Sequence, residues 1–235
     1  GGAVATDGEI ATRLGLPSAP AAAEALAITR DLILAEETGA RLHVRQVTTA
    51  AGLDLIRRAK QRGLPVTCGV TPAHWLLSET AIGDYRTFTR LSPPLRREDD
   101  RKAVLAAIGD GTVDVLCSGH DPRGPEAKRL PFEDAEPGMA GAETLLPLAL
   151  GLVRDEVPSM GRLFELLSAN PARLLGLDGG RIDQGAPADL ILVDVDAPWV
   201  VSGEKLLARA GNTPFDGLPV QGRVTRLWKG GREVV

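Results

Sequence analysis

The stretch LHVRQVTTAAGLDLIRRAKQRGLPVTCGVT, residues 42–71, decides the fold class of this chain. Residues 42–47 alternate between apolar and polar as a short strand does, and residues 65–71 predict a second strand. Residues 50–61 lie between them and carry a helical pattern. A strand, a helix of 10–15 residues and a second strand predict a parallel βαβ unit, so the fold class is α/β.

Helix ends are marked by the residue types that favour them. Thr48 or Thr49 can cap the helix after the first strand, and Gly63 can stop it. The Ala-rich helix expected over residues 20–38 is followed by Gly39, where a glycine in a left-handed conformation would end it.

The strand and helix order continues along the chain. A third buried strand is expected over residues 113–118. Further helices are expected over residues 98–108, 141–153, 159–169 and 171–176. Irregular structure is expected over residues 1–19, 73–97 and 119–138. Three or four βα units amount to about half of an eight-stranded barrel.

The sequence changes character near residue 178. Short strands separated by Gly, Pro and Asp turns are expected over residues 188–194, 222–228 and 232–235. We therefore expect two parts, residues 1–177 with parallel βα units and residues 178–235 with a small separate sheet. There is no internal repeat.

Composition excludes several classes of protein. Of the 235 residues, 43% are hydrophobic and 25% are charged, which excludes intrinsic disorder. The net charge of −4, with no long basic stretch, argues against nucleic acid as a partner. No apolar run approaches the roughly 20 residues that span a bilayer, so no membrane is expected as a partner. Two cysteines, Cys68 and Cys117, exclude a disulfide scaffold and suit the cytoplasm. Because the chain opens without Met, we interpret it as part of a longer protein.

Candidate site residues lie where the strands end, because parallel α/β folds place their sites at the carboxyl edge of the sheet. His43, His74 and His120 each lie close to a strand end. They could share a metal ion, although their spacing is not a local metal motif. The alternative is that His43 packs within the sheet while His74 and His120 are solvated loop residues.

Charged residues near the same loops also have two interpretations each. Asp121 and Arg123 can pair with each other or contact a ligand, and the alternative is a turn with an Asx-type bond. Arg96 follows a stiff Pro-Pro and can hold an anion, or form a surface ion pair with Glu98 or Asp99.

A set of motifs in a fixed order resembles a known family. These motifs are GEIATRLGLP (8–17), LHVRQVTT (42–49), VTPAH (70–74), SPPLR (92–96), KRLPF (128–132), PGMAGAET (137–144), GAPADL (185–190), NTPFDG (212–217) and GRV (222–224). Together they are similar to the C-terminal part of a dihydroorotase of the cyclic amidohydrolase superfamily. The resemblance implies the C-terminal half of a TIM (β/α)8 barrel, with a small β-sandwich subdomain at the C-terminus.

The resemblance also implies zinc chemistry, in which metal lowers the pKa of a bound water and a carboxylate moves the proton. Several of the family's ligands would lie before residue 1. A later zinc-binding His of the family corresponds to Gln46, and its catalytic Asp corresponds to Gly119. Gln is a poor zinc ligand and Gly supplies no base, although a reshaped loop could let Asp121 replace the missing carboxylate. The positions that would bind substrate are Ser92, Arg123, Pro137 and Gly138.

These departures predict a dihydroorotase-family protein of de novo pyrimidine biosynthesis with a degenerate metal site and weak or absent zinc binding. Its role would be structural, as an oligomer or in assembly with aspartate carbamoyltransferase. The alternative is an active zinc-dependent dihydroorotase or related cyclic amidohydrolase that hydrolyses the ring amide of dihydroorotate, so whether the chain is enzymatic stays open. A sugar- or nucleotide-binding α/β domain is a third interpretation. We also expect residues 1–235 alone to aggregate or to need a partner, because half a barrel leaves open sheet edges.

Overall fold

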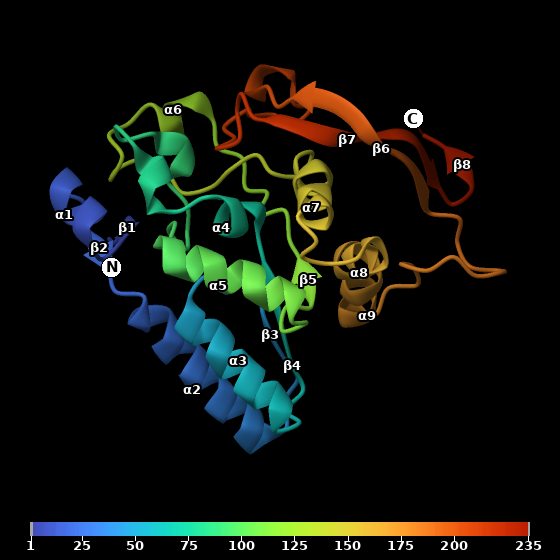
Figure 1. Cartoon of the computed structure of the whole chain (residues 1–235), viewed down its shortest axis with the longest axis horizontal. Coiled ribbons are helices and arrows are strands. Elements are labelled where there is room, and N and C mark those ends of the chain that lie inside the picture. Colours follow the sequence, from blue (N-terminus) through green and yellow to red (C-terminus); the bar gives the residue numbers. More distant parts are fainter. Residues whose placement is uncertain (1, 235) are drawn as a thin grey trace.

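The computed structural model describes residues 2–234, and the centre of the molecule is a parallel sheet (Figure 1). Its strands are β3 (Leu42–Val44), β4 (Val66–Val70) and β5 (Val115–Leu116), in the order β3-β4-β5. In the register, Leu42 of β3 pairs with Val66 of β4, and Gly69 of β4 pairs with Val115 of β5. Both pairings are parallel, as the strand–helix–strand order predicts, and the chain is a mixed α/β protein.

The first strand ends earlier than the alternating pattern predicts. Residues 42–47 alternate, but β3 stops at Val44. The Val47 amide still donates to the Gly69 carbonyl at 3.0 Å, so the chain stays beside β4 while it turns toward the next helix.

Three helices pack in sequence beside this sheet: α2 (Ala22–Thr38), α3 (Ala50–Gln61) and α5 (Glu98–Gly109). Helix α2 contacts β3 and α3, and α3 contacts β4 and α5 (Figure 1). The expected helix ends are confirmed. Thr49 caps α3 by accepting from the Gly52 amide at 3.1 Å, and Gly39 ends α2 with φ of 68°.

The helices of residues 145–175 follow after β5. They are α7 (Leu145–Arg154), α8 (Met160–Phe164), a π-helical segment (Glu165–Ala169) and α9 (Asn170–Leu175). The two helices expected over 159–169 and 171–176 are therefore one continuous helical stretch. Helix α7 begins four residues later than expected, because the amides of Gly141 and Ala142 donate to a side chain, His120 Nδ1, instead of starting a helix.

The expectation of irregular structure in the N-terminal segment and the two loops is wrong in part. These segments contain β1 (Ala5–Thr6), α1 (Glu9–Leu14), β2 (Ser18–Ala19), α4 (Pro72–Leu76), 3₁₀ turns at Glu79–Ile82 and Thr87–Thr89, and α6 (Pro125–Lys128). Each element has two to six residues. Such elements are too short for a hydrophobic period to develop, so the pattern could not reveal them.

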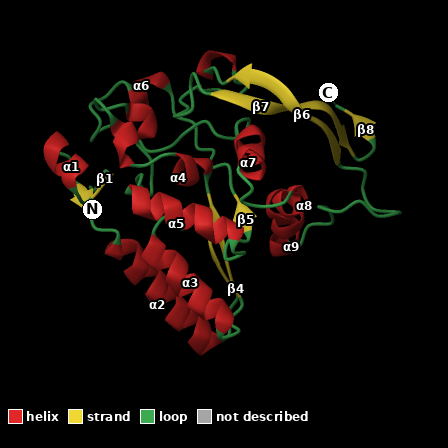
Figure 2. Cartoon of the chain, viewed as in Figure 1, coloured by secondary structure: helices red, strands yellow, loops and turns green. Residues whose placement is uncertain are grey.

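The C-terminal sheet is antiparallel and separate from the parallel sheet, as Figure 2 shows. It contains β6 (Leu190–Val200), β7 (Pro219–Lys229) and β8 (Arg232–Glu233), in that order. A short 3₁₀ turn, Gly203–Lys205, lies between β6 and β7, and β7 packs on α7. The expected strands are confirmed but β6 and β7 are longer, and the last expected strand residue, 235, lies outside the described range.

The main hydrophobic core lies between the parallel sheet and its helices. Its fully buried large side chains include Trp75, Leu53, Ile56, Ile108 and Leu150. No helix within residues 2–234 is long and apolar enough to cross a membrane.

Candidate functional site

A cavity of about 470 Å³ opens beyond the carboxyl ends of β3, β4 and β5. Its walls come from the segments that follow these three strands and from the loops near residues 92 and 138. The lining residues are Arg45, Gln46, Thr71, His74, Leu91, Ser92, Cys117, Ser118, Gly119, His120, Asp121, Pro137, Gly138 and Met139. The cavity therefore lies at the sheet edge where parallel α/β folds place their sites.

The cavity brings together most of the candidate residues that the sequence predicts. Those that line it are Gln46, Ser92, Gly119, Asp121, Pro137 and Gly138. Arg123 does not line the cavity, but its side chain contacts the lining residues Asp121 and Pro137. The structure thus collects residues separated by up to 92 positions around one space.

Arg123 is held by its neighbours in a single position. Its Nη2 donates to Asp121 Oδ2 at 2.7 Å, and its Nε donates to the Pro137 carbonyl at 2.9 Å. Its Nη1 lies 3.3 Å from Glu136 Oε2. The mutual ion pair of Asp121 and Arg123 is confirmed, whereas the Asx-type turn is wrong because the Arg123 amide donates to Asn212 Oδ1. The Asp121 carboxylate is consequently engaged by a guanidinium.

Asn212 joins the C-terminal part to the cavity wall, a contact that sequence reasoning missed. It is buried, its Oδ1 accepts from the Arg123 amide at 2.9 Å, and its Nδ2 donates to the Gly138 carbonyl at 3.0 Å. The available signal was the NTPFDG motif, which was used only as a mark of resemblance.

Gly119 occupies a backbone conformation that side chains other than glycine rarely adopt. Its φ is +61°, and a Cβ here would lie 2.8 Å from the Met139 Cε and 3.2 Å from the Thr71 Cγ2. A carboxylate at this position would therefore need a left-handed backbone and displacement of the flexible Met139 tip.

His74 is buried, so the expectation that it is a solvated loop residue is wrong. Its Nδ1 lies 2.8 Å from the Thr71 Oγ1, and its Nε2 lies 3.3 Å from the Pro93 carbonyl oxygen. Burial lowers the pKa of His74 to about 4, so the imidazole is neutral near pH 7. A neutral ring with Nε2 donating to Pro93 and Nδ1 accepting from Thr71 satisfies both nitrogens.

The other two histidines have different surroundings. His120 is exposed, as expected for a solvated loop residue, and its Nδ1 accepts from two backbone amides at 3.2 Å. His43 packs within the sheet as expected, with Nδ1 2.8 Å from the Thr67 Oγ1 on the neighbouring strand. Burial lowers the pKa of His43, and His43 does not line the cavity.

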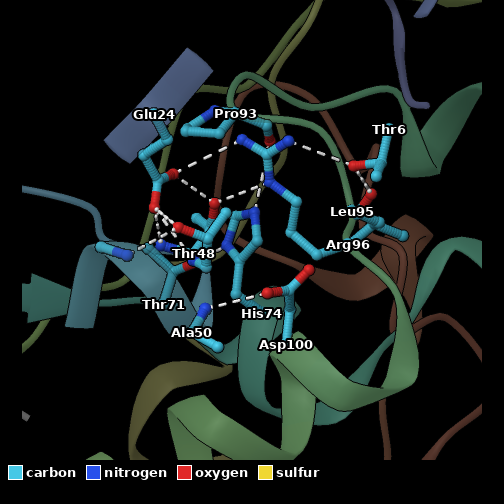
Figure 3. Close-up of polar contacts among 12 residues, drawn as sticks. Thr6, Glu24, Thr48, Ala50, Thr71, His74, Pro93, Leu95, Arg96 and Asp100 are labelled. Atoms are coloured by element: carbon cyan, nitrogen blue, oxygen red, sulfur yellow. Dashed lines mark hydrogen bonds and ion pairs between the residues drawn. The ribbon is translucent and has the colours of Figure 1, made fainter. Parts of the chain in front are cut away.

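A buried polar network lies close to His74 and Thr71 (Figure 3). Its centre is the carboxylate of Glu24 on α2. Glu24 Oε1 accepts from the amides of Thr48 and Thr49, both at 2.9 Å, and from the Thr49 Oγ1 at 2.7 Å. Glu24 Oε2 accepts from the Thr48 hydroxyl at 2.5 Å. The carboxylate therefore fixes the turn between β3 and α3, the segment that carries Gln46.

Arg96 completes this network and is not at the surface (Figure 3). Its Nε donates to the Thr48 Oγ1 at 2.9 Å, its Nη1 donates to the Thr6 Oγ1 at 3.2 Å, and its Nη2 lies 3.4 Å from Glu24 Oε2. The expected surface ion pair with a neighbouring acidic residue is therefore wrong. With all three guanidinium nitrogens engaged, Arg96 acts as a structural tie between α2 and the loop that bears Ser92.

Lys128 is a second buried cation that sequence reasoning missed. Its Nζ donates to the carbonyls of Thr87, Arg90 and Glu136 at 3.2, 3.1 and 2.7 Å. Burial lowers the pKa of Lys128 to about 8. The Arg90 carbonyl also accepts from the Gly138 amide at 3.1 Å, so this cluster holds the loop that forms one cavity wall.

The residues at positions 46 and 119 of this cavity do not fit a zinc ion. Zinc is bound by Cys, His and carboxylate side chains, whereas position 46 offers a carboxamide and position 119 offers no side chain. Both nitrogens of His74 are engaged, and the Asp121 carboxylate is paired with Arg123. Across residues 2–234, no group of three or more His, Cys, Asp and Glu side chains is arranged to hold a metal.

Comparisons with known proteins agree with the fold. A family model described as the amidohydrolase family matches residues 8–234. A dihydroorotase of Desulforapulum autotrophicum is 42% identical over 226 residues, which are 96% of this chain and 53% of that protein. A dihydroorotase of Pelobacter propionicus is 40% identical over 234 residues, covering 100% of this chain and 55% of that protein.

The fold is also similar to that of a solved structure. An L-hydantoinase from Arthrobacter aurescens superposes with a TM-score of 0.89 at 29% identity, over 97% of this chain and 51% of that chain. The chain thus spans about half the length of the curated relatives that it matches.

Proposed function

We propose that this chain is part of a dihydroorotase-family protein whose metal site is degenerate. The chain belongs to the amidohydrolase family and is similar to dihydroorotases along its whole length. This protein would serve de novo pyrimidine biosynthesis in the cytoplasm. The observation that carries the proposal is the pair of residues at the cavity, Gln46 and Gly119, where the family has a zinc ligand and a catalytic carboxylate.

The proposal includes a finer description of the fold. Residues 1–177 would be the C-terminal half of a (β/α)8 barrel, and residues 178–235 would contribute to a β-sandwich. The parallel order of β3, β4 and β5 and the antiparallel sheet of β6, β7 and β8 support this division. The cavity at the carboxyl edge then corresponds to the site position of such barrels.

The residues at the cavity can bind and orient a ligand, but they lack a free general base. Asp121 is paired with Arg123, His74 is neutral with both nitrogens engaged, and the Nδ1 of His120 already accepts from two backbone amides. General acid–base catalysis contributes about 10²–10⁴-fold to a rate, so loss of the carboxylate alone would lower turnover by a similar factor. Ser92 and the Pro137–Gly138 backbone remain at the wall, where they would contact a bound ligand.

A protein with this site would act through its surface. We propose that it assembles with aspartate carbamoyltransferase and has a structural role there. Size-exclusion chromatography of the complete protein, with and without the carbamoyltransferase of the same organism, tests this role. Separate elution of two folded proteins would contradict it.

The metal site is tested on the complete protein loaded with zinc. Zinc content is measured by mass spectrometry, and dihydroorotate hydrolysis is measured on the same sample. We expect less than one zinc per chain and negligible turnover. The variant with Gln46→His and Gly119→Asp should bind more zinc, whereas Gln61→His, an exposed position on α3, should not.

The alternative function is an active zinc-dependent dihydroorotase or related cyclic amidohydrolase. One zinc or more per chain, with a kcat of at least about 1 s⁻¹ in the unmodified protein, would establish that alternative and refute the degenerate site. Asp121 would then be the first residue to test as its base.

A further inference from the structure

A second cavity, of about 320 Å³, lies at the opposite end of the parallel sheet from the candidate site. It borders the amino ends of β4 and β5 and the helices α8 and α9. Its lining residues are Arg41, Thr67, Asp114, Val115, Arg162, Asn170, Arg173 and Leu174. Three of these eight residues are arginines, contributed by the segment before β3 and by two helices.

The arginines carry more positive charge than nearby carboxylates neutralise. Arg162 pairs with Glu165 at 2.9 Å. Arg173 donates to the neutral Asn170 side chain at 2.5 Å rather than to a carboxylate. Arg41 is exposed and, among the ion pairs of residues 2–234, it has no carboxylate partner.

The one carboxylate that lines the cavity is already engaged. Asp114 Oδ2 lies 2.6 Å from the Lys60 Nζ and accepts from the Cys68 amide at 2.8 Å. The negative charge of Asp114 is therefore balanced by Lys60 of α3. The cavity consequently keeps a net positive charge of about two, from Arg41 and Arg173.

We propose that this cavity binds a compact phosphate-bearing anion, held mainly by Arg41 and Arg173. The planar guanidinium presents paired N–H donors that match phosphate oxygens, which makes arginine a common residue in phosphate sites. Arg162 and Thr67 line the same space, but the Arg162 guanidinium is paired with Glu165 and the Thr67 hydroxyl contacts His43, so Arg41 and Arg173 would be the main donors. A volume of about 320 Å³ accommodates a pyrophosphate-sized group.

The site goes beyond the proposed function, since it shares no lining residue with the candidate site. A ligand here would stabilise the turn before β3 together with α9, two segments that are about 130 residues apart in the sequence. The site would make the stability of the protein respond to the phosphate compounds around it.

The test is calorimetric titration of the complete protein in zinc-free buffer with a chelator. Pyrophosphate, inorganic phosphate, ATP and malonate are the probes. We expect saturable binding of pyrophosphate, with malonate at least tenfold weaker. ATP binding as tightly as pyrophosphate would identify a nucleotide as the source of the phosphate group, and binding of pyrophosphate alone would identify an inorganic anion.

Variants decide whether the arginines are responsible. Arg41→Gln should raise the Kd for pyrophosphate at least tenfold, and Arg41→Lys should restore part of the affinity. Arg58→Gln, an arginine with 70% side-chain exposure on α3, is the matched control and should leave the Kd unchanged. Because Arg41 is exposed, its variants should keep the melting temperature of the ligand-free protein.

Three results would overturn the proposal: no saturable binding of any phosphate probe, equal binding of malonate, or an unchanged Kd in Arg41→Gln. None of them depends on hydrolysis of dihydroorotate. Discovery of turnover at the other cavity would refute the proposed function and leave this site standing.

Discussion

Replacing Arg96 with methionine should lower the free energy of unfolding by about 3–5 kcal/mol. The side chains of Arg96 and Glu24 are only 7% and 10% exposed, so the pair is shielded from water. The substitution removes donors to Thr48, Thr6 and Glu24, and it leaves the Glu24 carboxylate buried without its cationic partner. An unpaired buried charge, rather than the lost hydrogen bonds alone, accounts for most of this magnitude.

The assay is urea unfolding of the complete protein followed by tryptophan fluorescence, since Trp75 is fully buried in the same core. A double-mutant cycle with Glu24→Gln separates the pair from its surroundings. The double variant should be more stable than the sum of the two single losses predicts. Arg30→Met, which removes an arginine with 70% side-chain exposure, is the control and should cost less than about 1 kcal/mol.

A loss from Arg96→Met no larger than that from Arg30→Met would contradict the structural role of Arg96. Additive losses from Arg96→Met and Glu24→Gln would also contradict it, because the two side chains would then not share one network. A loss of 3–5 kcal/mol with strong coupling between the two positions would confirm the structural role of Arg96.

Three further predictions concern single residues around the cavity. Burial lowers the pKa of His74 to about 4, so the stability that its neutral ring contributes should be complete above about pH 6.5 and decrease by up to about 3 kcal/mol toward pH 4. Urea midpoints measured against pH would show this loss of stability, and His74→Gln should abolish the pH dependence. Gly138→Ala should cost about 2–4 kcal/mol, because φ is +134° and a Cβ would lie 2.3 Å from the Asp121 carbonyl oxygen; a change below 1 kcal/mol in urea unfolding would contradict this strain. Thr49→Ala should cost about 1–2 kcal/mol through loss of the cap on the Gly52 amide, whereas Thr49→Ser should be nearly neutral in the same measurement.

The helices and strands that the sequence predicts well are those with a repeated pattern and a marked end. Helix α3 is an example, because a threonine precedes it and its apolar positions recur over a full 12 residues. The elements that were missed have no such pattern. Strands β1 and β2 are two residues long and form only through pairing with each other, a contact that local sequence does not encode.

The candidate site could also be predicted only in part. Its position was predictable, because the carboxyl ends of parallel strands must meet at one edge, and the resemblance supplied the positions Ser92 and Gly138. The state of the charged residues was not predictable. Arg96 has Glu98 and Asp99 as close sequence neighbours, yet its partner is Glu24, 72 residues away. Only the packing of α2 against the turn after β3 brings the two together.

The contacts that shape the cavity walls do not involve the side chains at positions 46 and 119. Glu24 and Arg96 fix one wall, and Lys128 fixes the loop opposite. In the described chain, the side chain of Gln46 makes no hydrogen bond, and Gly119 has no side chain. Under the proposed function, loss of a metal ligand and a base at these positions would therefore cost the fold little. If the proposed function is correct, this separation would let the cavity keep its shape while its residues only bind a ligand.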